Sequence, residues 1–405
     1  MSFRTALSGL NAAQTDLAVT SNNIANANTF GFKQSRAEFA DVFSVSPLGV
    51  GRLQPGAGVR VSNVAQQFGQ GNIEFTGNSL DLAISGGGFF TLSDGGTPVY
   101  TRSGNFGANR DGFVVNPSGQ RLQVFPPNAN GGFDTGRSED LRLALGDNAP
   151  IPTGSAIIGT NLPANAPEPT VTPFDVNDAD SYNHTTSLTV FDSLGVSHVA
   201  TLYYVKTANP NEWQVNSFID GNAVGGTQTL QYSDAGALVA PATGELTLPA
   251  WTPPTGAAPI ALTLDLSDST QFGEQFAVNT LSQDGNTTGR LVGIDIDAEG
   301  VVFARFTNGQ SSALGQLAMT TFSNPSGLQK LGDNAWAATF ESGQALRGQA
   351  GSASFGLVQS GALEASNVEL TEQLVNMITA QRNFQANAQM ITTQDQVTQA
   401  ALNIR

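Results

Sequence analysis

The sequence contains no cysteine and little charge. Without cysteine, the chain has no disulfide scaffold, thiolate catalysis, zinc knuckle or iron–sulfur cluster. Charged residues make up only 12% of its 405 residues, about half of the usual share. The surface must therefore be covered largely by Asn, Gln, Ser, Thr and Gly. This composition suits a chain whose outside is mostly destined to become an interface with other protein.

Positive charge is especially scarce. The only lysines are Lys33, Lys206 and Lys330, and the net charge is -16. Such a chain repels the phosphates of nucleic acids and of anionic lipids. No stretch reaches the roughly 18 consecutive apolar residues that cross a bilayer, and the first residues lack the pattern of a cleaved signal peptide. We therefore expect no nucleic-acid partner and no membrane insertion.

Proline and acidic residues divide the chain by position. All 19 prolines lie between Pro47 and Pro325, so both ends of the chain are free of helix breakers. Residues 145–287 hold 14 acidic side chains but one basic side chain, Lys206. A shift this sharp predicts an inserted domain, with the chain before and after it forming one body.

These boundaries predict a multi-domain, mostly β protein with sandwich-like or barrel-like domains and long helical termini. The expected parts are terminal helices at 1–32 and 361–405, which form the inner assembly domain; an extended linker or β-hairpin region at 33–76; a discontinuous β core at 77–144 and 288–360; and an acidic, β-rich outer insert at 145–287.

Heptad spacing of apolar residues predicts that the two ends form an antiparallel, coiled-coil-like pair. The stripe residues that we expect to drive assembly are Phe3, Leu7, Leu10, Leu17, Ile24, Leu370, Leu374, Met377, Phe384 and Ile391. Gln14, Ser21 and Gln381 fill other positions of the stripe, so the pair should be weak, and the ends largely disordered, before assembly. Ser366 and Glu369 predict a capping box and a helix from Asn367 to near Ile404. The plainer alternative is two amphipathic helices packed on a globular core.

Alternating apolar and polar residues predict that the middle of the chain is mostly sheet. The run SLTVFDSLGVSHVATLYYVK alternates on both sides of a turn at 192–195, and Leu262, Leu264 and Leu266 alternate with polar residues. LVGIDIDAEGVVFARFTNGQ predicts another hairpin, which turns at 297–300.

Four sequence blocks resemble a known family. They are SNNIANANTFGFKQSR (21–36), LDLAISGGGFF (80–90), YTRSGNF with DGFVVNPSGQRL (100–122) and SNVELTEQLVNMITAQRNFQANAQMITTQDQ (366–396). In this order they resemble the axial proteins of the bacterial flagellar rod and hook. Within that family, an insert the size of 145–287 is similar to that of the hook members, because distal rod members are shorter.

The resemblance implies a structural subunit with no enzymatic activity and no cofactor. It implies a helical homopolymer, the curved flexible hook, which acts as a universal joint and transmits motor torque to the filament. The implied partners are copies of the chain itself, the distal rod protein, the hook cap protein, the hook–filament junction protein and the flagellar type III export apparatus. The implied location is extracellular, attached to the basal body, after export without a cleaved signal.

The family motif places several residues near the end of the first helix. Gly31 is expected to stop the helix in the left-handed backbone region, beside Phe32. The asparagines of the motif, for which either hydrogen bonding to nearby backbone or simple solvation is open, are Asn22, Asn23, Asn26 and Asn28. The triplet at 86–88 permits close backbone approach or a bulge, and it matches no phosphate-binding loop.

No catalytic or metal-binding pattern stands out. The only histidines, His184 and His198, fall in predicted sheet, without a nucleophile-elbow serine or a metal-ligand helix. The acidic residues at 295–300 begin like a calcium loop, but position twelve is Phe306, so a solvated hairpin tip is expected. The carboxylates at 175–180 are interpreted as a charged loop.

Two other interpretations stay open at this point. A rod protein or a hook–filament junction protein would share the terminal blocks. Alternatively, the acidic insert could be a secreted carbohydrate-binding or hydrolytic module on a polymerising frame. Deleting 145–287 separates these cases, because a structural insert should alter curvature and stiffness, whereas an active module would lose ligand binding.

Overall fold

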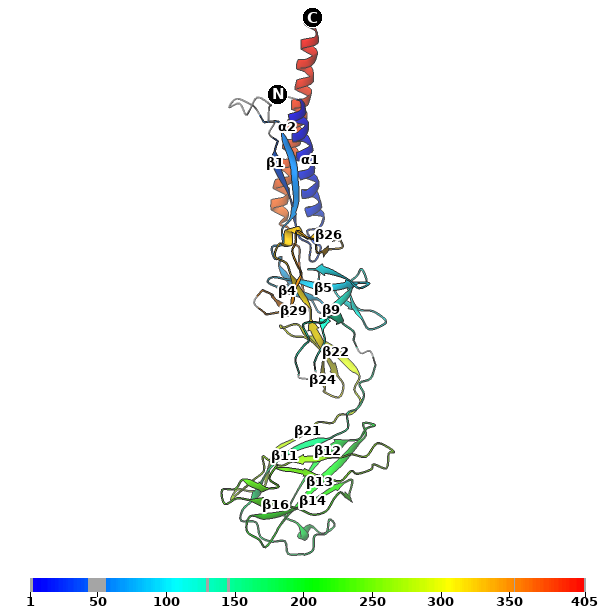
Figure 1. Cartoon of the computed structure of the whole chain (residues 1–405), viewed down its shortest axis with the longest axis vertical. Coiled ribbons are helices and arrows are strands. Elements are labelled where there is room, and N and C mark those ends of the chain that lie inside the picture. The colour runs from blue at the N-terminus through cyan, green and yellow to red at the C-terminus, as the bar shows by residue number, and fades with distance from the viewer. Residues whose placement is uncertain (1–2, 43–55, 129–130, 144–145, 353, 404–405) are drawn as a thin grey trace. The chain divides into compact units, whose positions relative to one another are not determined.

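A computed structural model describes residues 3–42, 56–128, 131–143, 146–352 and 354–403. The chain divides into two compact units, one made of Met1–Leu143, Gly293–Ala304 and Ser312–Arg405, and the other of Ala144–Val292 and Arg305–Ser311. Residues 43–55 of the predicted linker and the predicted boundary at 144–145 lie outside the described residues. The fold class is confirmed, because strands predominate and both long helices lie at the ends of the chain (Figure 1).

Two antiparallel helices form one end of the first unit (Figure 1). Helix α1 spans Phe3–Ala25 and helix α2 spans Leu370–Asn403. Neither contains proline, so their backbone hydrogen bonds run uninterrupted. The start of α2 differs from the prediction: Ser366 Oγ accepts from the backbone N–H of Val368 at 3.3 Å, and the helix begins only at Leu370. The predicted end at Ile404 lies outside the described residues.

A two-stranded ribbon runs beside the helices (Figure 1). Strands β1 (Ser35–Asp41) and β2 (Val59–Gln66) pair in antiparallel fashion. The backbone N–H of Val59 donates to Ser8 Oγ at 3.2 Å, which ties the start of β2 to α1. The ribbon therefore packs on α1 rather than forming part of the larger sheets.

The β core of the first unit combines two short ribbons with a large sheet. The ribbons pair β3 (Ile73–Phe75) with β30 (Ala362–Glu364) and β4 (Leu82–Ser85) with β29 (Leu357–Ser360). The sheet contains β5 (Phe89–Asp94), β6 (Thr97–Thr101), β7 (Gly107–Ala108), β8 (Val114–Val115), β9 (Arg121–Phe125), β10 (Glu139–Asp140), β22 (Leu291–Ile296), β23 (Val301–Phe306), β24 (Ser311–Leu317), β25 (Met319–Thr321), β26 (Gln329–Gly332), β27 (Ala335–Ala337) and β28 (Leu346–Gly348). The ribbons and the sheet share one hydrophobic core, which includes the fully buried Leu82, Ile84, Phe90 and Leu92.

The second unit consists of two sheets around one core. One sheet has the order β18-β19-β11-β20, with β21 on the other edge of β11, and the second has the order β12-β13-β14-β16-β17, with β15 beside β14. Their bounds are β11 Ser155–Pro163, β12 His184–Phe191, β13 Ser197–Lys206, β14 Glu212–Ile219, β15 Asn222–Ala223, β16 Gln228–Tyr232, β17 Leu238–Ala240, β18 Glu245–Thr247, β19 Thr263–Asp265, β20 Thr270–Phe272 and β21 Ala277–Gln283. Trp213, Tyr204 and Tyr232 fill the space between the sheets.

The predicted hairpin of the insert is confirmed. Strand β12 pairs with β13 along the whole length of β12, and inward residues alternate with outward ones. At the turn, the backbone N–H of Gly195 donates to the carbonyl of Asp192 at 3.0 Å. Gly195 has φ +80, a left-handed conformation that glycine adopts at little cost. The residues of the turn were therefore sufficient to predict how β12 and β13 pair.

Candidate functional site

The helix pair has a fixed antiparallel register. A Cβ on Gly9 of α1 would lie 2.5 Å from Asn387 Oδ1 of α2, so the two backbones approach closely there. Further along, Asn23 Nδ2 of α1 donates to Gln373 Oε1 of α2 at 3.1 Å. Gly9 and Asn23 are two heptads apart on α1, and their partners Asn387 and Gln373 are two heptads apart on α2 in the opposite direction. The two helices therefore contact each other over most of the length of α1.

On the α1 side, the residues at this seam are small or polar, so the seam differs there from the predicted stripe. The α1 residues that face α2 with the same heptad spacing are Ala6, Gly9, Ala13, Asp16, Thr20 and Asn23. Ala6, Ala13, Thr20 and Asn23 are buried. Each position is one residue before a position of the predicted stripe, which is about 100° of rotation on a helix with 3.6 residues per turn. The predicted stripe of α1 thus lies beside the seam rather than at its centre.

The predicted assembly residues occupy a mixture of environments. Phe3 is 49% exposed and Leu7 is 41% exposed, while Leu10, Leu17 and Ile24 are partly buried. On α2, Leu370 is 46% exposed and Leu374 is 50% exposed. Met377, Phe384 and Ile391 are partly buried and share the heptad of Gln373 and Asn387, which faces α1. The structure brings these three to the seam, and it leaves Phe3, Leu7, Leu370 and Leu374 exposed on the outside of the pair.

Asn23 is the asparagine of the family motif that binds backbone across the fold. Its side chain is buried, donates to the carbonyl of Ser35 at 2.7 Å and accepts from the N–H of Ser35 at 2.9 Å. Asn26 Nδ2 donates only to the carbonyl of Asn22, at 2.9 Å within the same turn. Asn22 and Asn28 are exposed. The two open readings of these asparagines therefore each hold for part of the set.

Gly31 is needed for a close approach rather than for stopping the helix. It has the expected left-handed backbone, with φ +69, but α1 already ends at Ala25. A Cβ on Gly31 would lie 2.5 Å from the backbone N of Ser103. Its N–H donates to the carbonyl of Glu364 at 2.7 Å, and Phe32 beside it is buried.

A buried ionic cluster lies just after this turn. Lys33 Nζ is 2.6 Å from Glu364 Oε1, and both side chains have zero exposed area. Arg102 Nη1 is 3.4 Å from Glu364 Oε2, and Arg102 is nearly as buried. Lys33 also donates to the carbonyl of Gly69 at 2.7 Å, and Arg102 to that of Gly86 at 2.8 Å. We call Lys33, Arg102 and Glu364 the buried junction; with the carbonyls of Gly69 and Gly86, it joins five separate segments of the first unit.

Burial shifts the pKa values of ionisable groups in and near this region. Desolvation lowers the pKa of Lys33 and of Arg102, and the carboxylate of Glu364 opposes the shift in both cases. Desolvation also raises the pKa of Asp16 at the helix seam. The sequence analysis missed the buried junction, and the only signal for it was that charges are rare in this chain.

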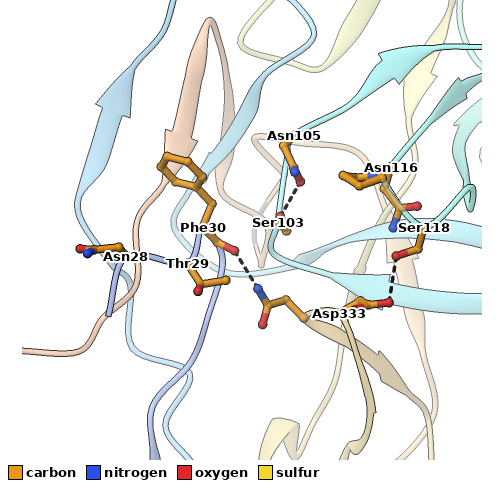
Figure 2. Close-up of a pocket in the computed structure, with 10 residues that line it drawn as sticks. Asn28, Thr29, Phe30, Ser103, Asn105, Asn116, Ser118 and Asp333 are labelled. Atoms are coloured by element: carbon orange, nitrogen blue, oxygen red, sulfur yellow. Dashed lines mark hydrogen bonds between the residues drawn. The ribbon is translucent and has the colours of Figure 1, made fainter. Parts of the chain in front are cut away.

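A polar cavity of about 400 Å³ opens beside the family motif (Figure 2). It is lined on one side by Asn28, Thr29 and Phe30, whose carbonyl accepts from Asn334 Nδ2 at 2.9 Å. Across the cavity, Ser118 Oγ donates to Asp333 Oδ2 at 3.0 Å. Asp333 is the only ionisable residue of the lining. The cavity can form hydrogen bonds, but it holds no acid–base pair.

The two histidines occupy structural positions in the second unit. His198 is buried, with Nδ1 2.6 Å from Asp220 Oδ2 and Nε2 3.4 Å from Asp192 Oδ2. His184 stacks on Phe276 with ring centroids 4.5 Å apart, and burial lowers its pKa. Among the described residues, no group of three or more His, Asp or Glu side chains is arranged to hold a metal ion.

The acidic motifs of the sequence form local turns. Asp297 Oδ1 accepts from the N–H of Val301 at 2.7 Å and closes the predicted turn at 297–300. Asp175 and Asp178 likewise accept from the backbone or side chains of residues two positions later. These carboxylates therefore hold their own loops in place. No helix in the described part of the chain is long and apolar enough to cross a membrane.

Comparison with known proteins supports this architecture. Four family profiles match in order: "Flagella basal body rod protein" at residues 3–33, "Flagellar hook protein FlgE/F/G D1 domain" at 83–173, "Flagellar basal body protein FlaE D2 domain" at 161–286 and "Flagellar basal body rod FlgEFG protein C-terminal" at 359–404. The flagellar hook protein FlgE of Escherichia coli K12 is 41% identical over 419 residues, covering 100% of both chains. The chain belongs to the flagellar hook protein family.

Other hook proteins extend the likeness. FlgE of Salmonella typhimurium LT2 is 40% identical over 426 residues, again across 100% of both chains. The crystal structure of the Helicobacter pylori hook protein FlgE2 shares the fold, with a TM-score of 0.56 and 14% identity over 72% of this chain and 100% of that one. As a member of the hook protein family, the chain has a structural role in the bacterial flagellum and in motility.

Proposed function

We propose that the chain polymerises with copies of itself into the curved, flexible tube of the flagellar hook, with α1 and α2 in the inner layer. The observation that supports this proposal is the direction of the large apolar side chains of the helix pair. Phe3, Leu7, Leu370 and Leu374 are each 41% to 50% exposed, although a seam of small residues lies next to them.

An isolated protein gains nothing from this arrangement. Complete burial of a large apolar side chain is worth about 1.5–3 kcal/mol, and these half-exposed side chains have realised only about half of it. Here the rest of that gain is left for contacts with other copies. When the surface that donates a contact differs from the surface that accepts it, subunits add head to tail, and a rotation that does not close produces a helical tube.

The second unit suits an outer position in such a tube. Its own core is complete, with Trp213, Leu230 and Leu264 fully buried, so it needs no neighbour to fold. Its acidic, polar surface favours contacts that slide and re-form as a bent tube rotates and passes motor torque to the filament. Weakly charged, polar contacts suit this motion better than large apolar patches.

The proposed partners follow from family membership. They are copies of the chain, the distal rod protein, the hook cap protein, the hook–filament junction protein and the flagellar type III export apparatus, which passes the chain to the outside without a cleaved signal. We propose no catalytic reaction, no nucleic-acid partner and no insertion in a membrane.

Charging the outer face of the helix pair tests the proposal. In the full chain, Leu374→Asp places a carboxylate on the exposed apolar face, and Asn383→Asp places one at an exposed polar position of the same helix. We expect Leu374→Asp to raise the concentration needed for polymerisation at least tenfold, about 1.4 kcal/mol. Asn383→Asp should stay within about twofold. Sedimentation and electron microscopy measure both.

Equal behaviour of the two variants, or a monomeric wild-type chain under all polymerising conditions with cap protein added, would contradict the helix-driven assembly. Point substitutions are preferable to deleting the ends. Removing 361–405 would also remove Glu364 and leave Lys33 and Arg102 buried without their carboxylate.

A further inference from the structure

Phe340 is the most exposed large apolar side chain among the described residues, with a relative accessibility of 102%. Single exposed apolar residues are common on protein surfaces and need no explanation by themselves. Phe340 differs because the turn that carries it is built rigidly. The backbone that carries the ring is therefore held in place, although the ring contacts nothing in its own chain.

Hydrogen bonds hold this turn on both sides of the ring. Thr339 Oγ1 donates to the carbonyl of Gly327 at 2.5 Å and accepts from the N–H of Glu341 at 3.2 Å. Ser342 is fully buried, and its Oγ donates to the carbonyl of Thr339 at 2.8 Å. Asn324 Nδ2 donates to the carbonyl of Glu341 at 3.0 Å. The backbone of this turn therefore loses little further conformational freedom on binding, and the remaining cost is that of fixing the Phe340 side chain.

The same unit carries an apolar groove of about 410 Å³ that could receive such a ring. We call it the α1–β2 groove; its lining includes Thr15, Ala18, Val19, Val64, Gln66 and Lys330. A cavity of about 150 Å³ is sufficient for benzene, so the groove has room for a benzyl side chain. Phe340 is fully exposed, so it does not occupy the groove of its own chain.

Charge at the two places is complementary. Glu341 follows Phe340 and is exposed, and Lys330 lies at the groove and is exposed. Among the described residues, neither forms an ion pair. A ring followed by a carboxylate thus matches an apolar groove bordered by an ammonium group, and such complementarity orients an encounter.

We propose that Phe340 of one copy inserts into the α1–β2 groove of a second copy, where Glu341 pairs with Lys330. The inference rests on the proposed function, because it needs a second copy. The donor and acceptor surfaces differ, so the contact is head to tail, and it builds a helical polymer when the rotation between copies does not close. The ring supplies the apolar burial, and the ion pair fixes the direction from which it enters.

Site-specific cross-linking tests the contact, because the full chain has no cysteine of its own. Chains with Phe340→Cys are mixed with chains with Val64→Cys, assembled and treated with a short thiol-to-thiol cross-linker. The matched control replaces Phe340→Cys by Phe75→Cys, since Phe75 is 77% exposed in the same unit. We expect cross-linked dimers in the first mixture and only background in the second. If a polymer forms but the first mixture gives no more cross-linked dimer than the control, this contact alone is overturned. If the unsubstituted chain forms no polymer, the proposed function is overturned as well.

Polymerisation of substituted full chains gives an independent measurement. Phe340→Ala should raise the critical concentration for polymerisation about tenfold or more. The midpoint of its thermal unfolding should be unchanged. Phe75→Ala should change the critical concentration by less than about twofold. Glu341→Lys and Lys330→Glu should each raise it about threefold, and the double variant should restore it to within about twofold. Equal effects of Phe340→Ala and Phe75→Ala, or no restoration by the double variant, overturn the proposal.

Discussion

Lys33 Nζ lies 2.6 Å from Glu364 Oε1 inside the protein, although 331 positions separate the two residues. Arg102 contacts the second oxygen of the same carboxylate at 3.4 Å. Two cations therefore share one anion in a site with almost no exposed area. Because charged groups are costly to bury, the site is stable only while all three members and their backbone partners are in place.

Glu364→Gln should destabilise the first unit strongly. The substitution leaves Lys33 and Arg102 buried without a counterion, a change that typically costs about 3–5 kcal/mol. Denaturant unfolding of the full chain, with hydrogen exchange followed in peptides covering 31–36, measures the loss. The matched control is Glu74→Gln on β3, the strand paired with β30, where the side chain is exposed and the change should stay within about 0.5 kcal/mol. Equal stabilities would show that the carboxylate does not hold the junction.

Gly31→Ala should cost more than the left-handed backbone alone explains. An alanine there pays about 1–2 kcal/mol for a positive φ and also collides with the backbone of Ser103. Gly119→Ala is the control, because Gly119 has φ +82 but open space around its Cβ position. The midpoint of thermal unfolding should therefore be clearly lower for Gly31→Ala than for Gly119→Ala. A similar loss in both variants would mean that the close approach relaxes without cost.

Asn23→Ala should loosen the helix pair, whereas Asn22→Ala should not. Asn23 makes two hydrogen bonds to the backbone of Ser35 and one to Gln373 of α2, and a buried partner left unsatisfied costs about 1–3 kcal/mol. Its neighbour Asn22 is exposed. Circular dichroism and hydrogen exchange of α1 and α2 measure the difference. If the two alanine variants exchange at the same rate, the side chain of Asn23 does not anchor the helices.

The second unit should lose stability in acid through Asp192. Burial alone would raise the pKa of Asp192, but hydrogen bonds from Val196, Thr255 and His198 outweigh it and lower the pKa below 3.8. The charged form is thus favoured by folding. Its contribution is complete above the ordinary Asp pKa of about 3.9 and is lost as the pH falls through the lower, folded value.

This pH dependence is measured by unfolding the full chain between about pH 6 and 2.5 while hydrogen exchange reports on peptides of β12 and β13. Asp192→Asn should unfold more easily at neutral pH and show a shallower decline in acid. A decline as steep as that of the wild type would assign the acid sensitivity to other carboxylates.

Local signals predicted the elements of this fold well. The absence of proline indicated both helices, and the turn residues at 192–195 fixed the hairpin of β12 and β13. These predictions succeeded because helix breakers and turn glycines act on their own neighbours in the chain. The same reasoning found the left-handed backbone of Gly31.

The seam and the buried junction could not be predicted in the same way. Two adjacent heptads fit α1, and choosing the one with Leu7, Leu10 and Leu17 assumes that the largest apolar residues pack within the chain. That assumption fails for α1, which places Gly9 and its small neighbours against α2. No local pattern joins Lys33 to Glu364, because their pairing depends on the whole first unit being assembled.

The position of Glu364 also sets an order of folding. The strands of the second unit, β11 to β21, lie between Ser155 and Gln283, so they can pair while later residues are still missing. The first unit cannot neutralise Lys33 until Glu364 arrives, and α1 has no Gln373 to contact before α2 forms. Contacts of such long separation in sequence form slowly. The first unit therefore completes its fold only after the segment that follows residue 360 is available, which means nearly the whole chain.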